Sequence, residues 1–224
     1  MKLFFATDIH GSDICWKKFL NAGKFYEADA LILGGDMTGK AVIPVVHEGG
    51  TKYRMVLLEQ NFEAESEGEL QDMLNRVRSR GYYPYLTTPD EIAELAKTPE
   101  KIHDIFNAEV LKVVQQWMDL ADKKLAETGL YVYCSPGNDD MDEVDEVVRS
   151  AKRVILVEGQ VTALDERHEM IASGWSNRTP WNTHREEDEP QLAVRYEAMA
   201  SQLKNPKNAV FNIHVPPHRS GLDE

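Results

Sequence analysis

The sequence predicts an α/β fold in which strands and helices form stacked layers. Short runs of apolar residues recur along the chain, and several of them are apolar throughout, which suits strands covered on both faces. Amphipathic stretches with helix-capping signals lie between some of these runs. An alternation of this kind is typical of an α/β domain.

Seven apolar runs are expected to form strands, at residues 3–7, 30–33, 130–134, 154–157, 161–164, 170–173 and 209–213. Three helices are expected between them. Residues 12–22 begin at the Ser of a Gly-Ser-Asp capping signal, residues 141–150 follow an acidic turn, and residues 190–203 are amphipathic. Together these elements account for most of the chain outside one long central block.

This central block, residues 41–128, interrupts the alternation. Two branched-apolar arms flank a Glu-Gly-Gly turn at its start, a pattern that predicts a β-hairpin. Helices are expected to follow at about residues 68–80, 89–96 and 99–127. We interpret the block as an inserted hairpin and helical cap, packed on or over a single domain that spans residues 1–224.

The composition limits the classes of partner. Hydrophobic residues make up 42% of the chain and charged residues 28%, which are values of a globular protein. The formal net charge is -13, from 38 acidic residues against 25 Lys and Arg. This charge argues against a nucleic-acid surface or an anionic-membrane surface, because both need a basic face. A small anionic substrate needs only a local positive centre, such as a metal ion.

The cysteine content predicts a cytoplasmic protein. Cys15 and Cys134 cannot form a disulfide framework, and the sequence contains no C-x-x-C pair. The apolar run at the N-terminus is too short for a signal peptide and is interrupted by Asp8. The sequence contains no run of about 18 apolar residues, so no membrane span is expected.

Four of the expected strands end in residues that can bind a metal ion. Asp8 and His10 follow the first strand and point the same way on an extended chain, Asp36 follows the second, Asn138 the third, and His214 the last. Ligands of α/β sheets bind at the carboxyl ends of strands, so we expect these side chains to meet. Taken singly, each residue is also typical of a turn, a helix cap or a structural histidine. As a set, carboxylate, imidazole and amide ligands suit a divalent ion such as Mn, Fe or Zn.

Four short motifs resemble, in order, those of the calcineurin-like metallophosphoesterase superfamily: Asp8-x-His10, Gly35-Asp36, Gly137-Asn138 and His214. The resemblance covers nearly the whole chain apart from the central block. It implies a four-layer α/β/β/α sandwich of mixed sheets and a centre of two divalent metal ions. Asp8 and His10 would hold one ion, Asn138 and His214 the other, and Asp36 would bridge them.

The resemblance also implies an activity. We expect a metal-dependent phosphoesterase, a hydrolase that cleaves small phosphate esters with phosphodiesters favoured. Two metal ions, with manganese among the candidates, would polarise a phosphoryl oxygen and activate a hydroxide that attacks phosphorus. No nucleic-acid or membrane partner is expected.

One departure from the family concerns the residue after Asn138. The family usually has a histidine there, whereas this chain has Asp139. A carboxylate beside two dications stays ionised near neutrality, so it is a poor general acid and repels a phosphate. We therefore expect slow turnover of esters with poor leaving groups. The alternative is that Asp139 turns away and caps the helix expected at residues 141–150.

A second departure concerns the end of the sequence. The family carries a Gly-His-x-His motif that supplies one ligand to each metal, and the 224 residues contain none. We expect that the sequence is truncated at its C-terminus. The alternatives are that His184 or His218 substitutes for the missing ligands, or that the centre binds metal weakly.

The loop at residues 173–190 is a candidate part of the substrate site. It places Arg178 between Trp175 and Trp181, and a guanidinium group matches the geometry of a phosphate. Arg178 therefore joins Asn138 and Asp139 as a candidate catalytic residue, and its change to Ala is expected to raise the Michaelis constant. The alternative is an exposed loop whose tryptophans pack on the inserted block.

Two other functions fit parts of the sequence. Gly34, Gly39 and Lys40 nearly match a P-loop, but Ala41 replaces the magnesium-binding hydroxyl, and branched residues follow where the motif needs a helix. The other alternative is a scaffold of the metallophosphoesterase fold, non-catalytic or only weakly metal-binding, that binds a protein partner through residues 41–128.

Overall fold

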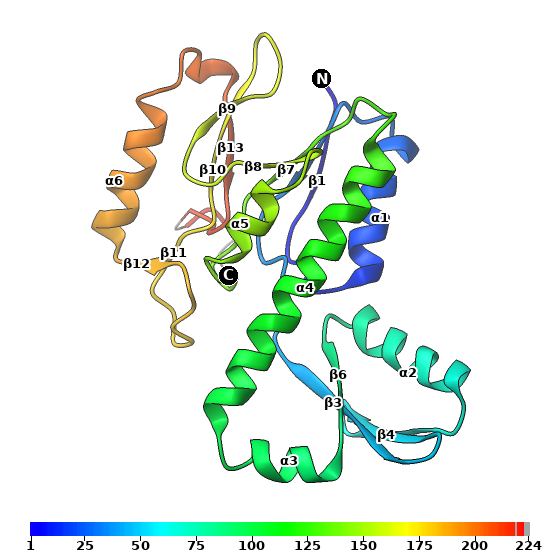
Figure 1. The fold of residues 1–224 in the computed structure, drawn as a ribbon. Coiled ribbons are helices and arrows are strands. Elements are labelled where there is room, and N and C mark those ends of the chain that lie inside the picture. Colours follow the sequence, from blue (N-terminus) through cyan, green and yellow to red (C-terminus); the bar gives the residue numbers. More distant parts are fainter. Residues whose placement is uncertain (218, 222–224) are drawn as a thin grey trace. The chain divides into compact units, whose positions relative to one another are not determined.

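The structure is a computed structural model that describes residues 1–217 and 219–221. It shows a mixed α/β protein with several sheets and helices, as the sequence predicted (Figure 1). Among the helices of the described residues, none is both long and apolar enough to cross a membrane.

The chain divides into two compact units, which are described separately. The first unit comprises Met1–Asp8, Lys18–Met37 and Gln115–Glu224, and the second comprises Ile9–Lys17 and Thr38–Val114. The central block expected at residues 41–128 thus overlaps the second unit, and its last residues are grouped with the first.

A parallel sheet of four strands forms the centre of the first unit. Its strands, in the spatial order β1-β2-β7-β8, are β1 (Leu3–Ala6), β2 (Ala30–Leu33), β7 (Val132–Cys134) and β8 (Val154–Leu156). Leu3 pairs with Ala30, Leu31 with Val132, and Val132 with Val154. Because all four strands run in one direction, their carboxyl ends lie at the same edge of the sheet.

A mixed sheet of three strands packs against the parallel sheet. Its strands, in the spatial order β13-β10-β9, are β9 (Val161–Ala163), β10 (Glu169–Ser173) and β13 (Val210–Ile213). β13 runs parallel to β10, whereas β9 runs antiparallel to it. Met170 and Ala172 of β10 face the parallel sheet and pack with Ile32 of β2, while Ile171 faces the other way. Alternate residues of β10 therefore belong to two different layers of core.

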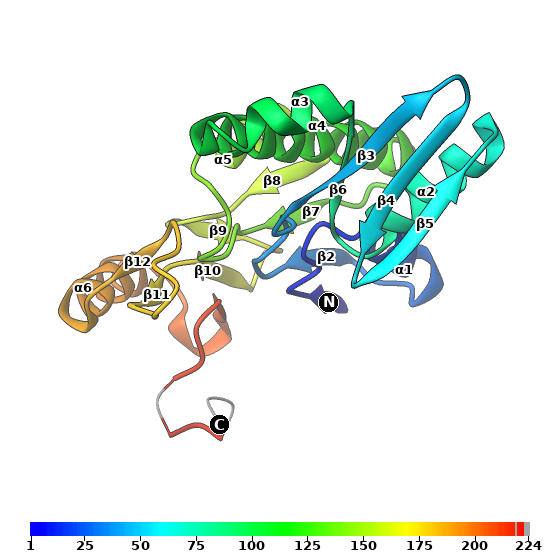
Figure 2. The same cartoon turned by 90° about the horizontal axis from the view of Figure 1, so that it is seen from below.

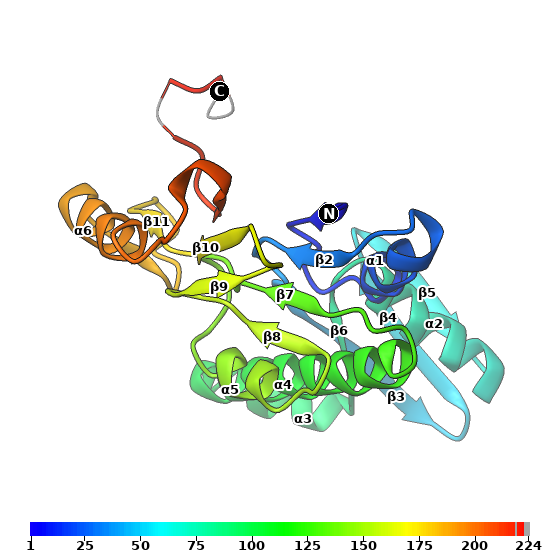
Figure 3. The same ribbon diagram turned by 90° about the horizontal axis from the view of Figure 1, so that it is seen from above.

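Helices cover the outer faces of these two sheets. Met199 of α6 (Glu189–Ala200) packs on Ile171 of the mixed sheet. On the parallel sheet, the ring of Phe4 lies 6.2 Å from that of Phe19 in α1 (Asp13–Phe25), and α5 (Val144–Arg149) contacts β8. α4 (Pro99–Leu125) belongs to the first unit from Gln115 onward. Figure 3 shows α5 and this part of α4 against one face of the parallel sheet, and α6 beyond the mixed sheet.

The second unit is built around a hairpin sheet of four strands (Figure 2). Its strands, in the spatial order β5-β4-β3-β6, are β3 (Val42–Gly49), β4 (Lys52–Leu57), β5 (Gln60–Ala64) and β6 (Tyr83–Thr87). Val46 of β3 pairs with Arg54 of β4, which confirms the predicted hairpin. β6 lies parallel to β3 on its other side.

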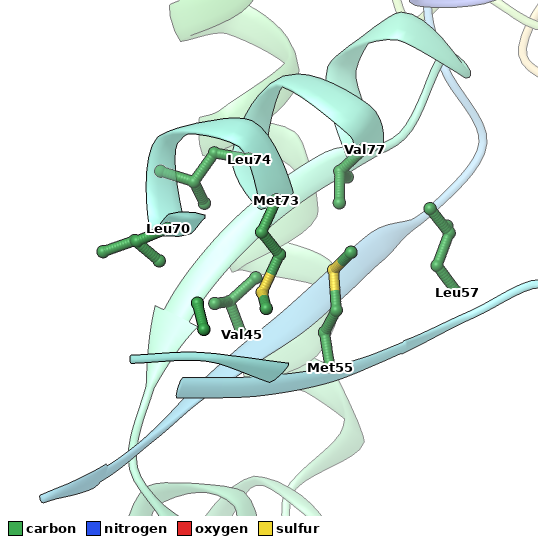
Figure 4. Packing of buried hydrophobic residues seen from close by; sticks show 8 residues of the cluster. Val45, Met55, Leu57, Leu70, Met73, Leu74 and Val77 are labelled. Carbon is green, nitrogen blue, oxygen red and sulfur yellow. The ribbon is translucent and has the colours of Figure 1, made fainter. Parts of the chain in front are cut away.

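One face of the hairpin sheet is buried by α2 (Glu67–Ser79). Ser66 caps the start of this helix, because its hydroxyl accepts from the Glu69 N–H group. The Glu69 carboxylate in turn accepts from the Ser66 hydroxyl and from the Glu65 N–H group. The apolar side chains that form the contact are, from the helix, Leu70, Met73, Leu74 and Val77 and, from the strands, Val45, Met55, Leu57 and Ala64 (Figure 4). This cluster gives the second unit a core of its own.

The expected strands and helices are present, with ends that shift by a few residues. α3 (Pro89–Leu95) and α4 correspond to the second and third helices of the central block. The apolar runs did not predict β5, β6, or the short strands β11 (Ser176–Asn177) and β12 (Glu186–Glu187). These strands are polar or contain proline, so they lack the pattern on which the prediction relied. The one-turn helix η1 (Pro206–Asn208) was also not predicted.

The P-loop alternative is wrong. A P-loop lysine begins a helix that holds the phosphates, whereas the residues that follow Lys40 form strand β3.

Candidate metal centre

Two carboxylates lie side by side at the ends of β1 and β2. The Asp8 N–H group donates to the Gly35 carbonyl at 3.0 Å, so the turns after the two strands are joined. Asp8 and Asp36 have φ values of 54° and 47°, in the left-handed region that Asp adopts more readily than most residues. The Thr7 hydroxyl also donates to Oδ2 of Asp8 at 2.6 Å. The backbone turns therefore fix the direction of both carboxylates.

Asp8, His10 and Asp36 form a group of potential metal ligands. One ligand atom from each residue lies within 4.8 Å of the other two. Asp8 is exposed, His10 is half-buried and Asp36 is buried. The sequence predicted that these three side chains would meet, and the structure brings them together.

His214 and Asn138 add two further potential ligands beside Asp36. The Nε2 atom of His214 lies 3.0 Å from Oδ1 of Asn138 and 3.4 Å from Oδ1 of Asp36. The side chains of His214 and Asp36 are each only 10% exposed. Asp36 therefore belongs to both groups of ligands, the one with Asp8 and the one with His214.

The other ring nitrogen of His214 determines its tautomer. Nδ1 lies 3.1 Å from the Gly34 carbonyl oxygen, which can only accept, so Nδ1 must carry a proton. In the neutral ring Nε2 then has a lone pair, which faces the two oxygen atoms of Asn138 and Asp36. Burial lowers the pKa of His214, but hydrogen bonding to Asp36 and its charge outweigh burial, so the pKa is raised. Three electron-pair donors thus meet where a cation is favoured.

Gly137 allows the loop after β7 to approach Asp36 closely. A Cβ atom at position 137 would lie 2.3 Å from both the backbone nitrogen and Oδ1 of Asp36, too close for any side chain. The next turn adds a hydrogen bond, from the Asp139 N–H group to Oδ1 of Asp36 at 3.1 Å. The bridging carboxylate predicted from the sequence is thus held by the backbone of the third strand end.

The amide of Asn138 is oriented by two residues of the loop at residues 173–190, Thr183 and Glu186, for which the sequence predicted no role. Its Nδ2 atom donates to Oγ1 of Thr183 at 2.7 Å, and that hydroxyl donates to the Glu186 carboxylate at 2.6 Å. Partial burial raises the pKa of Glu186, but hydrogen bonds from Thr179 and Thr183 outweigh it and lower the pKa to about 2.

Asp140 and Arg185 are buried residues that support the strand ends. Oδ2 of Asp140 accepts from the Met37 N–H group at 3.1 Å and from the Gly137 N–H group at 2.7 Å. Arg185 donates to the Asp140 carbonyl at 3.1 Å and to the Asp145 carboxylate at 2.7 Å. Neither role was predicted from the sequence, because Asp140 is one acid in an acidic turn and Arg185 one charge in a charged loop.

Glu158 joins the ends of β7 and β10. Its Oε2 atom accepts from the Ser135 hydroxyl at 2.8 Å and from the Gly174 N–H group at 2.7 Å, and Oε1 accepts from the Ser173 hydroxyl at 3.4 Å. Burial raises the pKa of Glu158, against the hydrogen bonds from Gly174 and Ser135, which lower it. This carboxylate was not predicted to have any role.

Asp139 does not cap the following helix. α5 begins at Val144, later than expected, and its N-cap residue is Glu143, which makes no side-chain capping bond. The capping alternative for Asp139 is therefore wrong.

Arg178 forms an exposed ion pair in the structure. Nε of Arg178 pairs with the Asp188 carboxylate at 2.6 Å, with side chains that are 61% and 57% exposed. The guanidinium group that lies over the Trp175 ring, 4.2 Å from its centre, belongs to Arg195. Trp181 is 80% exposed. An aromatic enclosure of Arg178 by both tryptophans is thus not formed.

Of the two spare histidines, the structure describes His184 only. His184 is exposed and does not belong to the Asp-His-Asp group found among the described residues. His218 lies outside the described residues.

The backbone that carries His10 packs tightly within the second unit. A Cβ atom at Gly81 would lie 1.9 Å from the His10 carbonyl oxygen, and one at Gly39 would lie 2.0 Å from the Gly81 carbonyl oxygen. The Ser12 hydroxyl donates to the Ser79 carbonyl at 2.9 Å. These contacts hold the loop in which His10 lies.

Comparisons with known proteins concern the fold more than the function. No family model matches the chain. An uncharacterized protein of Methanocaldococcus jannaschii is 34% identical over 103 residues, which cover 45% of this chain and 44% of that protein. The match thus spans less than half the length of this relative.

A solved crystal structure resembles the fold along most of the chain. It covers 96% of this chain and 69% of its own, with a TM-score of 0.50 and 11% sequence identity. At this identity the likeness concerns the α/β fold alone.

Proposed function

We propose that this chain is a metal-dependent phosphoesterase of the calcineurin-like metallophosphoesterase type, with two divalent ions at its centre. The observation that carries the proposal is the convergence of Nε2 of His214 with Oδ1 of Asn138 and Oδ1 of Asp36, at 3.0 and 3.4 Å. These residues come from three different strand ends, and the order of their motifs along the chain supports the same family.

The layers of the first unit support the finer fold proposal. These layers follow the order of a four-layer α/β/β/α sandwich (Figure 3). They are, in turn, α5 with the part of α4 from Gln115 onward, the parallel sheet, the mixed sheet and α6. The functional edge would be the one at which β1, β2 and β7 end.

The donor set fits two divalent ions. Asp8 and His10 would hold one ion, Asn138 and His214 the other, and Asp36 would bridge them because it belongs to both groups. Carboxylate, imidazole and amide donors suit Mn, Fe or Zn. Gly137 leaves room for the Asp36 carboxylate, because a Cβ at position 137 would lie 2.3 Å from its Oδ1 atom.

When bound, a pair of such ions supplies Lewis-acid polarisation of a phosphoryl oxygen and makes water a stronger acid. Asp8 and Asp36 contribute two negative charges against the four positive charges of the ions, and Asn138 contributes none. The centre is then locally positive in a chain whose net charge is -13, which suits a small anionic ester.

Asp139 follows the ligand Asn138 and adds a further negative charge next to the centre. This charge repels a phosphomonoester dianion more than a phosphodiester monoanion, which favours diesters as substrates. Arg178 stays a predicted phosphate-binding residue, which would have to exchange its ion pair with Asp188 for the substrate.

The test is hydrolysis of bis(4-nitrophenyl) phosphate by the purified chain. The proposal predicts activity with added Mn²⁺, loss of activity with a chelator, and loss of activity in Asp36→Asn at every Mn²⁺ concentration. A protein that binds no divalent metal and hydrolyses no ester would instead favour the non-catalytic scaffold that binds a partner through residues 41–128.

A further inference from the structure

The orientation of the Asn138 amide decides whether this residue can serve as a ligand. An amide has a carbonyl oxygen that can bind a metal ion and an NH₂ group that cannot. In the structure Oδ1 faces Nε2 of His214 at 3.0 Å, and Nδ2 donates to Oγ1 of Thr183 at 2.7 Å. A rotation of the amide by half a turn would exchange these two groups.

Thr183 opposes this rotation because its single hydroxyl proton is already used. Oγ1 of Thr183 donates to Oε1 of Glu186 at 2.6 Å, and a carboxylate can only accept. The lone pairs of the hydroxyl are thus left for Asn138, and they need a donor. A rotated amide would place its oxygen against these lone pairs.

Glu186 in turn is fixed by hydrogen bonds from the loop around it. Oε2 accepts from the Thr179 N–H group at 2.9 Å, and Oε1 accepts from the Thr183 N–H group at 2.9 Å as well as from the Thr179 hydroxyl. The Arg185 N–H group also donates to the Asn138 carbonyl at 3.1 Å, so the loop is joined to the backbone of the same residue.

We propose that Thr183 is a positioning residue, which directs the carbonyl oxygen of Asn138 toward the metal centre by accepting a hydrogen bond from its NH₂ group. This inference rests on the proposed function, since it concerns one ligand of the proposed centre. Glu186 serves the same role one step further away, because it takes the proton of Thr183. Partners that orient metal ligands typically change metal affinity about 10- to 100-fold when they are removed.

The test is the affinity of the full chain for Mn²⁺, measured by electron paramagnetic resonance of the free ion during a titration. Thr183→Val removes the hydroxyl and keeps the shape, and Thr183→Ser restores the hydroxyl. Thr183→Ala is a second variant that removes the hydroxyl without placing a new methyl group beside Glu186. The matched control is Thr179→Val, which removes a hydrogen bond to the same carboxylate without touching Asn138.

We expect Thr183→Val and Thr183→Ala to bind one of two Mn²⁺ ions about 10- to 100-fold more weakly, while Thr183→Ser and Thr179→Val stay close to the unchanged protein. Unchanged affinity in Thr183→Val or Thr183→Ala would overturn the inference. So would an equal loss in Thr179→Val, because the loop as a whole would then be responsible. If the unchanged protein binds no Mn²⁺, the proposed function fails first and the inference falls with it.

Discussion

Nε2 of His214 lies 3.0 Å from Oδ1 of Asn138, although 76 residues separate them in the sequence. The two residues follow strands of different sheets, β13 of the mixed sheet and β7 of the parallel sheet. Their contact therefore depends on how the two sheets pack, through the cluster that contains Ile32 and Met170. The contact between His214 and Asn138 therefore forms only when the two sheets of the first unit are packed correctly.

The buried ion pair of Arg185 should stabilise this unit strongly. Its guanidinium group lies 2.7 Å from the Asp145 carboxylate, with side chains that are 3% and 16% exposed. Arg185→Ala would remove the hydrogen bonds that the Asp145 carboxylate and two buried backbone carbonyls accept from it, so we expect the free energy of unfolding to fall by about 3–5 kcal/mol. Urea denaturation measures this quantity.

Arg178→Ala is the matched control for that change. It removes an arginine–aspartate pair of similar geometry, with Asp188, whose side chains are more than half exposed. An exposed pair contributes about 0–1 kcal/mol. Similar losses in the two variants would contradict the role given to Arg185.

Glu158 should make stability depend on pH. Burial raises the pKa of its carboxyl above the ordinary value of 4.5, so the folded protein binds this proton more tightly than the unfolded chain does. The resulting stabilisation is complete below the unfolded value and is lost as pH rises through the raised folded value.

Glu158→Gln removes this titration and can keep the hydrogen bonds from Ser135 and Gly174. Relative to the unchanged protein, the variant should therefore gain free energy of unfolding as the pH rises from about 4 to 7. Denaturation curves at several pH values, with a chelator present, measure the difference. A difference that stays constant, or that falls with rising pH, would show that the pKa is not raised.

Gly39→Ala should loosen the loop that carries His10. The new Cβ would lie 2.0 Å from the Gly81 carbonyl oxygen, so the backbone must move. We expect a loss of about 1–3 kcal/mol in the free energy of unfolding and weaker Mn²⁺ binding.

Gly68→Ala is the control, because Gly68 lies in α2 and a Cβ there meets nothing within 4 Å. Gly68→Ala should leave the free energy of unfolding unchanged or raise it by up to about 1 kcal/mol. Equal effects of the two changes would argue against the close packing.

Asp139 should make the rate sensitive to the leaving group. As an ionised carboxylate it cannot protonate a departing alkoxide, whereas a nitrophenolate departs without a proton. We expect nitrophenolate to be released from bis(4-nitrophenyl) phosphate much faster than alkoxide is released from an alkyl nitrophenyl or a dialkyl phosphodiester. Asp139→His should narrow this difference. Equal rates on aryl and alkyl leaving groups in the unchanged protein would refute the role of Asp139.

The strand ends could be predicted from the sequence because each ligand follows directly on an apolar run. Apolar runs of four or five residues indicate buried strands, and parallel strands bring their carboxyl ends to one edge. The sequence therefore predicts that Asp8, Asp36 and Asn138 meet. The polar strand β5 gave no such signal.

The supporting residues could not be predicted in this way. Thr183 lies 45 residues from Asn138, and Asp140 lies 103 residues from Met37, so no local pattern marks either contact. A buried acid such as Glu158 has the same letter in the sequence as an exposed one. These interactions depend on how loops from different sheets come together, which apolar spacing does not describe.

The central claim is that Asp36 bridges two ions held by ligands from four strand ends. The most direct test is the number of Mn²⁺ ions bound per chain in the unchanged protein, in His214→Ala and in Asp36→Asn. The account predicts two ions in the unchanged protein, one in His214→Ala, and weakened binding of both in Asp36→Asn. The same number of ions in all three proteins, or none in any of them, would contradict it.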